Sequence, residues 1–335
     1  MTKKPEPVSH EALDMRGAVV VVPAKDAIST LGACIAALHN AGMPRDRLIV
    51  VDDGSSDGTG DLARDAGVTV IRNETPLRPA LARNKGVAAS DAEIILFVDA
   101  DVTVHPDALK RLLKAFDDPS TTAVIGSYDH TPPPSPALSK YRNLLHHHVH
   151  QTAPREAQTF WTGLGAVRRA AFDAAGGLDP DWTDIEDVEF GLRLIAEGGR
   201  IILDPKILGS HLKVWTMRSM VRTDFWGRAI PWTRLIAKGR IAPDALNTGL
   251  RHKLSALAVL TFSGALLGAL IWPFTLWAAL GAALGFVALN ASFLALLWRV
   301  GGPILALKAI PYHAIHYATA LGGYAYGRFS PAKPS

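Results

Sequence analysis

Two short acidic segments place carboxylates at a spacing that suits a divalent cation. The segment DDGSSDGT runs from Asp52 to Thr59, and the segment DAD runs from Asp99 to Asp101, directly after the apolar run IILFV. Mg²⁺ and Mn²⁺ take oxygen ligands, and Mg²⁺ is typically held by one or two carboxylates together with substrate phosphates. A cation bound there would neutralise the charge of a leaving diphosphate. Arg64 stands where an EF-hand needs its bidentate Glu, so we reject a calcium loop.

The same acidic residues also fit a plain structural role. Aspartate accepts hydrogen bonds from the backbone in turns and at helix N-termini. Asp52 and Asp57 can therefore cap the turn and the helix that follows, and we assign no function to Asp57.

The elements around these residues read as alternating strand and helix. Apolar runs rich in Val and Ile lie between helical segments such as 31–41 and 106–116; the runs are AVVVVPA, RLIVVDD, VTVIRN and EIILFVDAD. This pattern predicts an α/β fold with a mostly parallel sheet covered by helices on both faces. Ligands of such sheets bind at the carboxyl ends of strands. The acidic segments therefore lie where a ligand is expected.

Composition narrows the class of protein. The 335 residues include 35 Lys and Arg against 31 Asp and Glu, so nothing points to a nucleic-acid partner, which favours a strongly basic face. The single cysteine, Cys34, excludes an intramolecular disulfide and fits a reducing compartment. Residues 1–16 form a polar tail with no apolar core, which argues against a signal peptide.

The C-terminal third predicts membrane contact. Residues 254–298 contain no Asp, Glu, Lys, Arg or His, a run too long for one helix across a hydrocarbon core of about 30 Å. Pro273 divides the run into two predicted spans, 254–272 and 274–298, with Trp272 and Trp277 at interfacial depth. The basic residues that flank the spans, Arg251, Lys253 and Arg299, predict cytoplasmic ends. For the third segment, 301–327, spanning, re-entering and lying flat stay open.

The segment before the spans mixes cations with apolar side chains. Within 216–250 the cations are Arg218, Arg222, Arg228, Arg234, Lys238 and Arg240, and only Asp224 opposes them up to Arg240. Such segments suit the lipid headgroup layer. The alternative is a solvated face covering a core, because Gly227 and Pro231 interrupt a clean amphipathic helix.

The motifs together resemble family-2 glycosyltransferases with the GT-A fold. The motifs, in order, are VVPAKD at 21–26, DDGSSDGT, ARNKG at 82–86, DAD, FWTGLGAVRRAAFDAAGGLD and IEDVEFGLRL. The resemblance covers about 17–215. It implies an α/β GT-A nucleotide-diphospho-sugar transferase sheet with C-terminal transmembrane helices. The expected division is a catalytic domain over 17–215, interfacial helices over 216–250 and a transmembrane region over 251–328.

The resemblance implies a role for each matching position. The nucleotide-sugar would contact residues that follow the strands: Pro23, Ala24, Asp26, Asp52, Asp53, Arg83, Lys85, Asp99 and Ala100. Asp101 would be the principal ligand of Mg²⁺ or Mn²⁺, with Asp99 and His211 beside it. The acceptor would lie against Trp161, Thr162 and Gly163.

The segment IEDVE resembles the acidic pair of the family. This implies that Asp187 is the general base on the acceptor hydroxyl, with Glu186 next to it. Such a base contributes about 10²–10⁴-fold to the rate. Six acids lie within 179–189, so repulsion can raise one pKa. If the acceptor is a polyprenyl phosphate, no base is needed.

The histidines of the run HHHVH, 146–150, have several interpretations. A helix starting near Ser135 would place His146 and His150 on one face, where a zinc site, contact with an acceptor phosphate, and plain packing are all conceivable.

The expected protein is an inverting glycosyltransferase of the cytoplasmic membrane, multi-pass, with its catalytic domain in the cytoplasm. Its expected partners are a UDP-sugar donor, a lipid-linked or saccharide acceptor, and membrane lipids, with no nucleic acid. The rivals are a non-catalytic scaffold that binds sugar nucleotides and a nucleotidyltransferase. The processive-synthase signature Q-x-x-R-W is absent, which argues against long-chain polymer synthesis.

Overall fold

The computed structural model describes residues 17–131, 133, 135–239 and 249–330. The tail predicted for 1–16 and the cation Arg240 lie outside the described residues. The strands are β1 Ala18–Ala24, β2 Leu48–Asp52, β3 Thr69–Arg72, β4 Ile94–Val98, β5 Val102–Val104, β6 Ala123–Tyr128, β7 Glu156–Ala157, β8 Leu164–Arg168 and β9 Ile201–His211. The helices are α1 Leu31–Asn40, α2 Thr59–Asp65, α3 Pro79–Ala88, α4 Ala108–Lys114, α5 Ala137–Thr152, α6 Arg169–Ala174, α7 Glu186–Ala196, α8 Met217–Arg222, the π-helix η3 Thr223–Ala229, α9 Ile230–Ala237, α10 Leu250–Gly268, α11 Thr275–Leu289 and α12 Ala291–Phe329, with short 3₁₀ turns at Arg45–Arg47 and Ala115–Asp117.

The described strands form one mixed sheet of nine strands in the order β3-β2-β1-β4-β8-β6-β9-β5, with β7 paired to β9. The half built from β3, β2, β1 and β4 is parallel, as predicted. The expectation of a mostly parallel sheet is wrong for the other half, because β8 runs antiparallel to both β4 and β6. A strand that is buried on both faces is an apolar run in either direction, so the residue pattern does not reveal its orientation.

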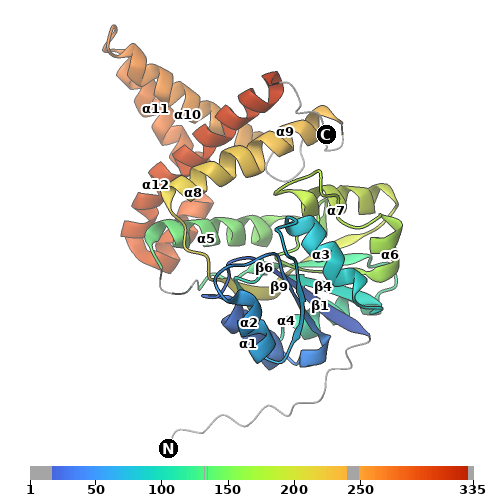
Figure 1. The fold of residues 1–335 in the computed structure, drawn as a ribbon. Helices are drawn as coiled ribbons and strands as arrows, with labels where there is room; N and C mark the ends of the chain where they lie inside the picture. Colours follow the sequence, from blue (N-terminus) through green and yellow to red (C-terminus); the bar gives the residue numbers. More distant parts are fainter. Residues whose placement is uncertain (1–16, 132, 134, 240–248, 331–335) are drawn as a thin grey trace, which may run out of the picture.

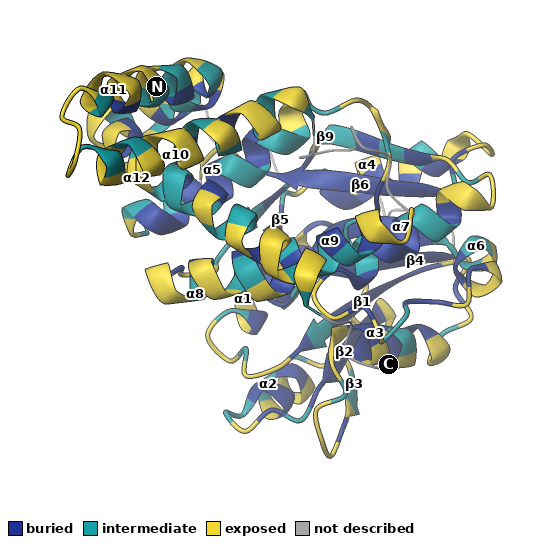
Figure 2. Cartoon of the chain, turned by 90° about the horizontal axis from the view of Figure 1, so that it is seen from above, coloured by how far each residue is buried: buried dark blue, intermediate teal, exposed yellow. Residues whose placement is uncertain are grey.

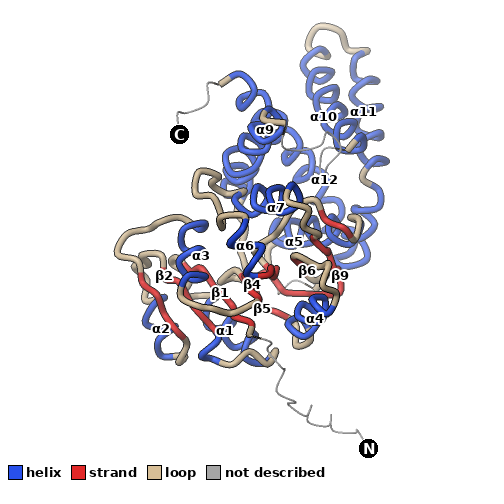
Figure 3. The backbone as a smooth tube through the Cα atoms, turned by 90° about the vertical axis from the view of Figure 1, so that its right-hand side faces the viewer, coloured by secondary structure: helices blue, strands red, loops and turns tan. Residues whose placement is uncertain are grey.

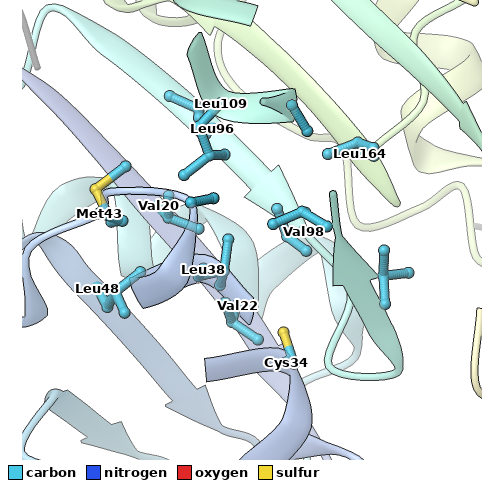
Figure 4. Packing of buried hydrophobic residues seen from close by; sticks show 14 of the residues in the cluster. Val20, Val22, Cys34, Leu38, Met43, Leu48, Leu96, Val98, Leu109 and Leu164 are labelled. Atoms are coloured by element: carbon cyan, nitrogen blue, oxygen red, sulfur yellow. The ribbon is translucent and has the colours of Figure 1, made fainter. Parts of the chain in front are cut away.

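Side chains of alternating residues form a separate core on each face of the sheet. On one face Val20 and Val22 of β1 and Leu96 and Val98 of β4 pack with Leu38 of α1 and other residues of α1 and α4 (Figure 4). On the other face their neighbours in sequence pack against α3, α6 and α7 (Figure 1). Each fully buried Val or Leu contributes roughly 1.5–3 kcal/mol. The helices thus hold the carboxyl ends of β1, β2 and β4 at one edge of the domain.

The C-terminal helix α12 is attached to this domain through α5. Leu138, Tyr141 and Leu144 of α5 share a buried cluster with Phe293 and Leu297 of α12. Gly302 has φ 73° and interrupts α12, which continues beyond the kink and packs beside η3 and α9 (Figure 1). The body and the last helix therefore form one continuous structure.

The helices α10 and α11 pack against each other as a hairpin that projects from the body (Figures 1 and 3). Apolar side chains at and near its tip are exposed: Leu270 is 85% exposed and Trp277 is 76% exposed. Exposed residues dominate the hairpin surface in Figure 2. By length and composition, α12 is the one helix among the described residues that passes as a membrane span.

The helix bounds differ from the two spans expected from sequence. The segment 274–298 is not one helix, because α11 ends at Leu289 and α12 begins at Ala291. The side chain of Asn290 donates to the Ser255 hydroxyl of α10 and to the Phe286 carbonyl. An uncharged Asn in an apolar run is invisible to a count of charges, so the sequence analysis missed this turn.

Candidate functional site

A cleft of about 840 Å³ opens where β1, β2 and β4 end. Its walls also include Thr162, the N-terminus of α7 and the segment after β9. The residues that line the cleft include Pro23, Ala24, Lys25, Asp26, Asp53, Arg78, Arg83, Asp99, Ala100, Asp101, Thr162, Asp184, Glu186, Asp187, Lys213 and Val214. Residues far apart in sequence thus share one cavity, whose volume lies within the usual range for small-molecule sites.

Asp101 lines the cleft and contacts His211, the last residue of β9, which is not itself among the lining residues. The distance between Asp101 Oδ2 and His211 Nε2 is 3.3 Å. Asn143 of α5 donates its amide N–H to the His211 carbonyl, and its Oδ1 lies 2.9 Å from His211 Nδ1. With that amide orientation, Nδ1 of His211 donates a proton to Asn143. Neutral His211 therefore turns a lone pair, and not a proton, toward the Asp101 carboxylate.

Two acceptors at 3.3 Å repel unless a proton or a cation lies between them. A protonated His211 satisfies the contact, and so does a divalent cation bound by both atoms. A hydrogen bond from the second ring nitrogen to an oxygen acceptor is typical of metal-ligating histidines. Asp101 and His211 therefore fit as protein ligands of a divalent cation, the role that remains a prediction for these two residues.

Asp99 is not arranged like Asp101. Its Oδ1 accepts from Arg83 Nη2 at 2.7 Å, and Arg83 Nη1 donates to Glu186 Oε1, also at 2.7 Å. No cluster of three or more His, Cys, Asp or Glu that could hold a metal occurs within the described residues. The predicted three-residue set of Asp99, Asp101 and His211 is thus reduced to two, because Arg83 holds the Asp99 carboxylate. Substrate phosphate oxygens and water would complete a coordination sphere.

Asp187 lies at the start of α7 with its carboxylate in the cleft. Its Oδ2 accepts from the backbone N–H of Thr162 at 3.2 Å and from the Thr162 hydroxyl at 3.3 Å, and its Oδ1 accepts from the N–H of Val188. These contacts orient the carboxylate from two sides. A carboxylate so held can accept a proton from a hydroxyl group that enters the cleft.

Burial favours the protonated form of each acid in this cleft, but the net pKa shifts have different directions because the neighbouring charges differ. Burial raises the pKa of Asp187, although Arg83 and the N–H of Thr162 oppose the shift. Burial likewise raises the pKa of Glu186, to about 7, against the attraction of Arg83. Burial also disfavours ionised Asp101, but the hydrogen bond and charge of a protonated His211, together with the charge of Lys213, outweigh it and lower the pKa of Asp101. The carboxylate suited to hold a cation and the carboxylate suited to take a proton are thus distinct groups.

Comparison with known proteins identifies the domain that builds this cleft. Residues 19–176 match the family model described as Glycosyl transferase family 2. The chain contains a family 2 glycosyltransferase domain. The prediction of a glycosyltransferase is thereby confirmed.

Curated proteins similar to this chain include a glycosyltransferase and a biosynthesis protein. The Pre-mycofactocin glycosyltransferase of Mycobacterium tuberculosis is 26% identical over 244 residues, which cover 70% of this chain and 51% of that protein. The chain thus spans about half the length of that curated relative. The Succinoglycan biosynthesis protein ExoA of Rhizobium meliloti is 28% identical over 328 residues, which cover 91% of this chain and 94% of that one.

A solved structure gives the fold. The mannosyltransferase PcManGT from Pyrobaculum calidifontis, solved in complex with GDP-Man and Mn²⁺, superposes with a TM-score of 0.60 at 22% identity, over 98% of this chain and 91% of that one. The α/β GT-A-like fold with a mixed sheet is therefore confirmed.

The family 2 domain gathers most of the predicted nucleotide-side residues, but not all. Pro23, Ala24, Asp26, Asp53, Arg83, Asp99 and Ala100 line the cleft. Asp52 does not, because it is fully buried, accepts from the N–H of Ser55 and pairs with Arg72 at 3.1 Å. It caps the turn, which is the structural alternative left open by the sequence. Lys85 also lies off the cleft and donates to Asn73 Oδ1 at 2.6 Å.

Asp53 holds a loop of the domain in place. Its carboxylate accepts from the Asn73 amide at 2.8 Å and from the backbone N–H groups of Leu77 and Arg78. Asn73 contacts both Lys85 and Asp53. Lys85 therefore acts on the cleft indirectly, through the loop that Asp53 holds. Arg78, which has φ 79°, precedes α3 and lines the cleft.

Of the three residues predicted for the acceptor side, only Thr162 lines the cleft. Trp161 packs against Tyr128, His146 and His150. A Cβ on Gly163 would lie 2.5 Å from the Trp161 ring, so this glycine accommodates Trp161 and does not line the cleft.

The histidine run packs behind the cleft. His147 and His150 contact backbone carbonyls of β6 through Nδ1, and His146 packs on Tyr128. Burial lowers the pKa of His150 to about 4. Of the three interpretations, the contacts favour packing.

Four charged cleft residues were not predicted from the sequence: Lys25, Arg78, Asp184 and Lys213. Lys25 and Lys213 had a signal, since Lys25 directly precedes Asp26 and Lys213 lies two residues after His211. Asp184 was counted among the six acids but not singled out. Its φ of 69° is uncommon for a residue with a side chain and marks a constrained position beside Glu186.

Proposed function

We propose that this chain is an inverting, divalent-cation-dependent glycosyltransferase that moves a sugar from a nucleoside diphosphate to a hydroxyl acceptor at the cytoplasmic face of a membrane. The observation that carries the proposal is that Asp101, which pairs with His211, lines the same cleft as Asp187. Asp101 and His211 suit a cation that binds a diphosphate, and Asp187 suits an incoming nucleophile.

In the proposed step, the acceptor oxygen attacks the anomeric carbon from the side opposite to the diphosphate. The new C–O bond forms as the bond between the anomeric carbon and the phosphate oxygen breaks, and the nucleoside diphosphate leaves with that electron pair. Asp187 takes the acceptor proton, and Thr162 keeps its carboxylate oriented. Asp101 and His211 would hold a divalent cation, which would neutralise the charge of the leaving diphosphate.

Arg83 serves as a positioning residue in this proposal. It ties Asp99, at the end of β4, to Glu186, directly before the base. The side chains of Arg83 and Glu186 are buried, so the bridge is shielded from water and stays strong. The donor half and the acceptor half of the cleft are thereby held at a fixed separation.

The donor is proposed to be a nucleoside-diphosphate sugar, with the cation Mg²⁺ or Mn²⁺. The sequence resemblance favours UDP, whereas PcManGT was solved with GDP-Man and Mn²⁺. Asp53, Asp26, Lys25 and Lys213 line the cleft; in this proposal the two acids would face the base and ribose, and the two lysines would face the phosphates. The assay must therefore include both bases.

The membrane part of the proposal rests on exposed apolar surface. A soluble monomer rarely exposes contiguous apolar patches larger than a few hundred Å². At about 1.5 Å per residue, the 19 residues of α10 extend about 28 Å and the 15 residues of α11 about 22 Å. We propose that this hairpin enters the bilayer, and that residues 17–215, the helices within 216–250 and the part of α12 that packs beside them stay on the cytoplasmic side.

The test uses membranes that contain the full chain. They are incubated with radiolabelled UDP-glucose, UDP-galactose and GDP-mannose, each with Mn²⁺, and the label is followed into organic and aqueous phases. The proposal expects transfer of label from at least one donor, and loss of that transfer in Asp101→Asn. Nucleotide binding without turnover would instead indicate the non-catalytic scaffold, and nucleotide transfer to a sugar phosphate would indicate a nucleotidyltransferase.

A further inference from the structure

A second group of charged residues lies on the membrane side of the cleft. Lys213 and Asp184 line the cleft, and the π-helix η3 approaches Asp184 so closely that a Cβ on Gly227 would lie 3.3 Å from its carboxylate. Gly227 therefore permits the contact between η3 and the loop that precedes α7. Two basic residues of this segment lie close in sequence to the contact: Arg228, next to Gly227, and Arg222, directly before η3.

The basic side chains around η3 are not all neutralised by acidic side chains. Asp224 of η3 is already engaged by Arg142, whose two terminal nitrogens donate to its two oxygens at 3.0 and 2.9 Å. Arg228 lies 3.9 Å from the same carboxylate, and its side chain is 48% exposed. Arg222 has no salt-bridge partner within 4 Å among the described residues. Arg228 and Arg222 are therefore available to an anion that enters from outside.

The electrostatic interactions of the cleft acids point to the same three cations. Burial raises the pKa of Asp184, and Lys213, Arg222 and Arg228 oppose that rise. The charge of Arg228 also acts on Asp187 and Tyr128. Of the cations in the described part of 216–250, Arg218 and Arg234 show no such interaction with these acids.

An apolar stripe leads away from this cationic group. Val214 lines the cleft and is 64% exposed, and Met217 and Val221 continue the exposed surface along α8. The spacing of three and four residues places the members of a helix on one face. Trp226 of η3, which is 56% exposed, lies farther along beside Tyr326 of α12.

We infer that Lys213, Arg222 and Arg228 form an acceptor subsite for the phosphate or diphosphate of a lipid-linked acceptor, whose hydrocarbon chain lies along Val214, Met217 and Val221. This inference rests on the proposed function and names its acceptor class. A phosphate suits this site because arginine binds phosphate oxygens in a bidentate fashion. A hydrocarbon chain suits the stripe because water leaves exposed apolar side chains when they are covered.

The test measures binding of farnesyl phosphate to the purified full chain in detergent by calorimetry. Mn²⁺ and UDP or GDP are present at saturation, so that the donor part of the cleft is filled and the probe reports the second site. Arg222→Gln/Arg228→Gln is expected to weaken binding at least about tenfold, since charge-assisted hydrogen bonds are roughly twice as strong as neutral ones. Arg218→Gln/Arg234→Gln removes the same charge from the same segment and is the matched control.

Two further measurements separate the phosphate from the chain. Met217→Ser/Val221→Ser is expected to weaken farnesyl phosphate severalfold and to leave the affinity for inorganic phosphate unchanged. Inorganic phosphate is expected to bind wild type more weakly than farnesyl phosphate. Equal affinities for the two probes would overturn the lipid part of the inference.

An equal loss in the control variant, or no loss in Arg222→Gln/Arg228→Gln, would overturn the assignment of the phosphate site. These outcomes differ from failure of the proposed function itself. If wild type binds neither UDP nor GDP in the presence of Mn²⁺, the proposed function fails; if it binds one of them but not farnesyl phosphate, only the acceptor subsite fails.

Discussion

The Asp101 carboxylate and the His211 imidazole meet at 3.3 Å, with Asn143 fixing the tautomer from the opposite side of the ring. The relationship joins the DAD segment after β4 to the end of β9, over a hundred residues later in the chain. It is produced by the pairing of β5 with β9, in which Val102 lies opposite His211. The sheet itself therefore sets the geometry of the proposed cation site.

Asp187→Asn is expected to lower the rate of transfer to a hydroxyl acceptor by about 10²–10⁴-fold, because it removes the group that takes the proton. The KM for the donor is expected to change little, since Asp187 lies on the acceptor side. Wild type and Asp187→Asn are compared by steady-state kinetics, with the acceptor that the radiolabel transfer experiment identifies. Unchanged turnover would contradict a general-base role and favour a phosphate nucleophile.

The pH profile of wild type tests the same residue independently. The base must be ionised, so activity is lost as the pH falls through the pKa of Asp187. Burial raises that pKa, so the acid limb of kcat is expected at higher pH than for an exposed aspartate, whose ordinary value is 3.8. An acid limb at or below that value would contradict the assignment.

Arg83→Met is expected to destabilise the fold by roughly 3–5 kcal/mol, because removing one partner leaves a buried charge on Glu186. Arg83→Met/Glu186→Gln is expected to recover part of this loss, since the second change removes the unpaired charge. Chemical denaturation of the detergent-solubilised chain gives both values. Strict additivity of the two single changes would show that the ion pair at 2.7 Å is energetically silent.

Asp224 provides a pH-dependent contribution to stability. Burial opposes its ionisation, but the contacts with His316 and Arg142 prevail and lower its pKa to about 2. Because the folded pKa lies below the ordinary value of 3.8, the stabilisation is complete above that value and is lost as the pH falls toward 2.

Asp224→Asn is therefore expected to destabilise the chain at neutral pH, and to do so less as the pH is lowered from 4 to 2. Thermal unfolding over this range measures the effect, with Asp107→Asn, which alters an exposed ion pair on α4, as the control. A pH-independent difference would contradict the assigned role of the Asp224 charge.

The hairpin of α10 and α11 is expected to hold the chain in the membrane. Replacing Leu270, Ile271, Phe274 and Trp277 with Ser removes apolar side chains at and near its tip that are largely exposed. The variant is expected to be extracted from membranes by milder conditions than wild type, as measured by carbonate or high-salt washing. The same number of Ser substitutions at exposed positions of α1 and α2 serves as the control, and equal extraction of all three proteins would argue against membrane insertion.

The sequence was sufficient for the parts of the molecule that depend on apolar runs and strand ends. The runs that became β1, β2 and β4 were assigned correctly, and Asp101 and Asp187 do share a cleft. Both results follow because parallel strands covered on two faces are apolar throughout and place the residues after them at one edge.

Other features depend on side-chain partners that residue types do not reveal. Arg83 has the charge expected of a phosphate ligand, yet two acids distant in sequence engage it. Asp52 and Asp53 are adjacent and chemically equal, but one faces the turn and the other the cleft, because neighbouring side chains of a strand point to opposite faces. The break at Asn290 likewise depends on partners in α10 and α12.

The most direct test of the central claim is a titration of Mn²⁺ followed by electron paramagnetic resonance, in the presence and absence of UDP or GDP. Wild type is expected to bind Mn²⁺ more tightly with the nucleotide than without it, because the phosphate oxygens would complete the coordination sphere. Asn143→Ala is expected to weaken binding by about 10–100-fold, and Asp101→Asn and His211→Ala by more. Mn²⁺ affinity that is independent of nucleotide and unaffected by Asp101→Asn or His211→Ala would contradict the account.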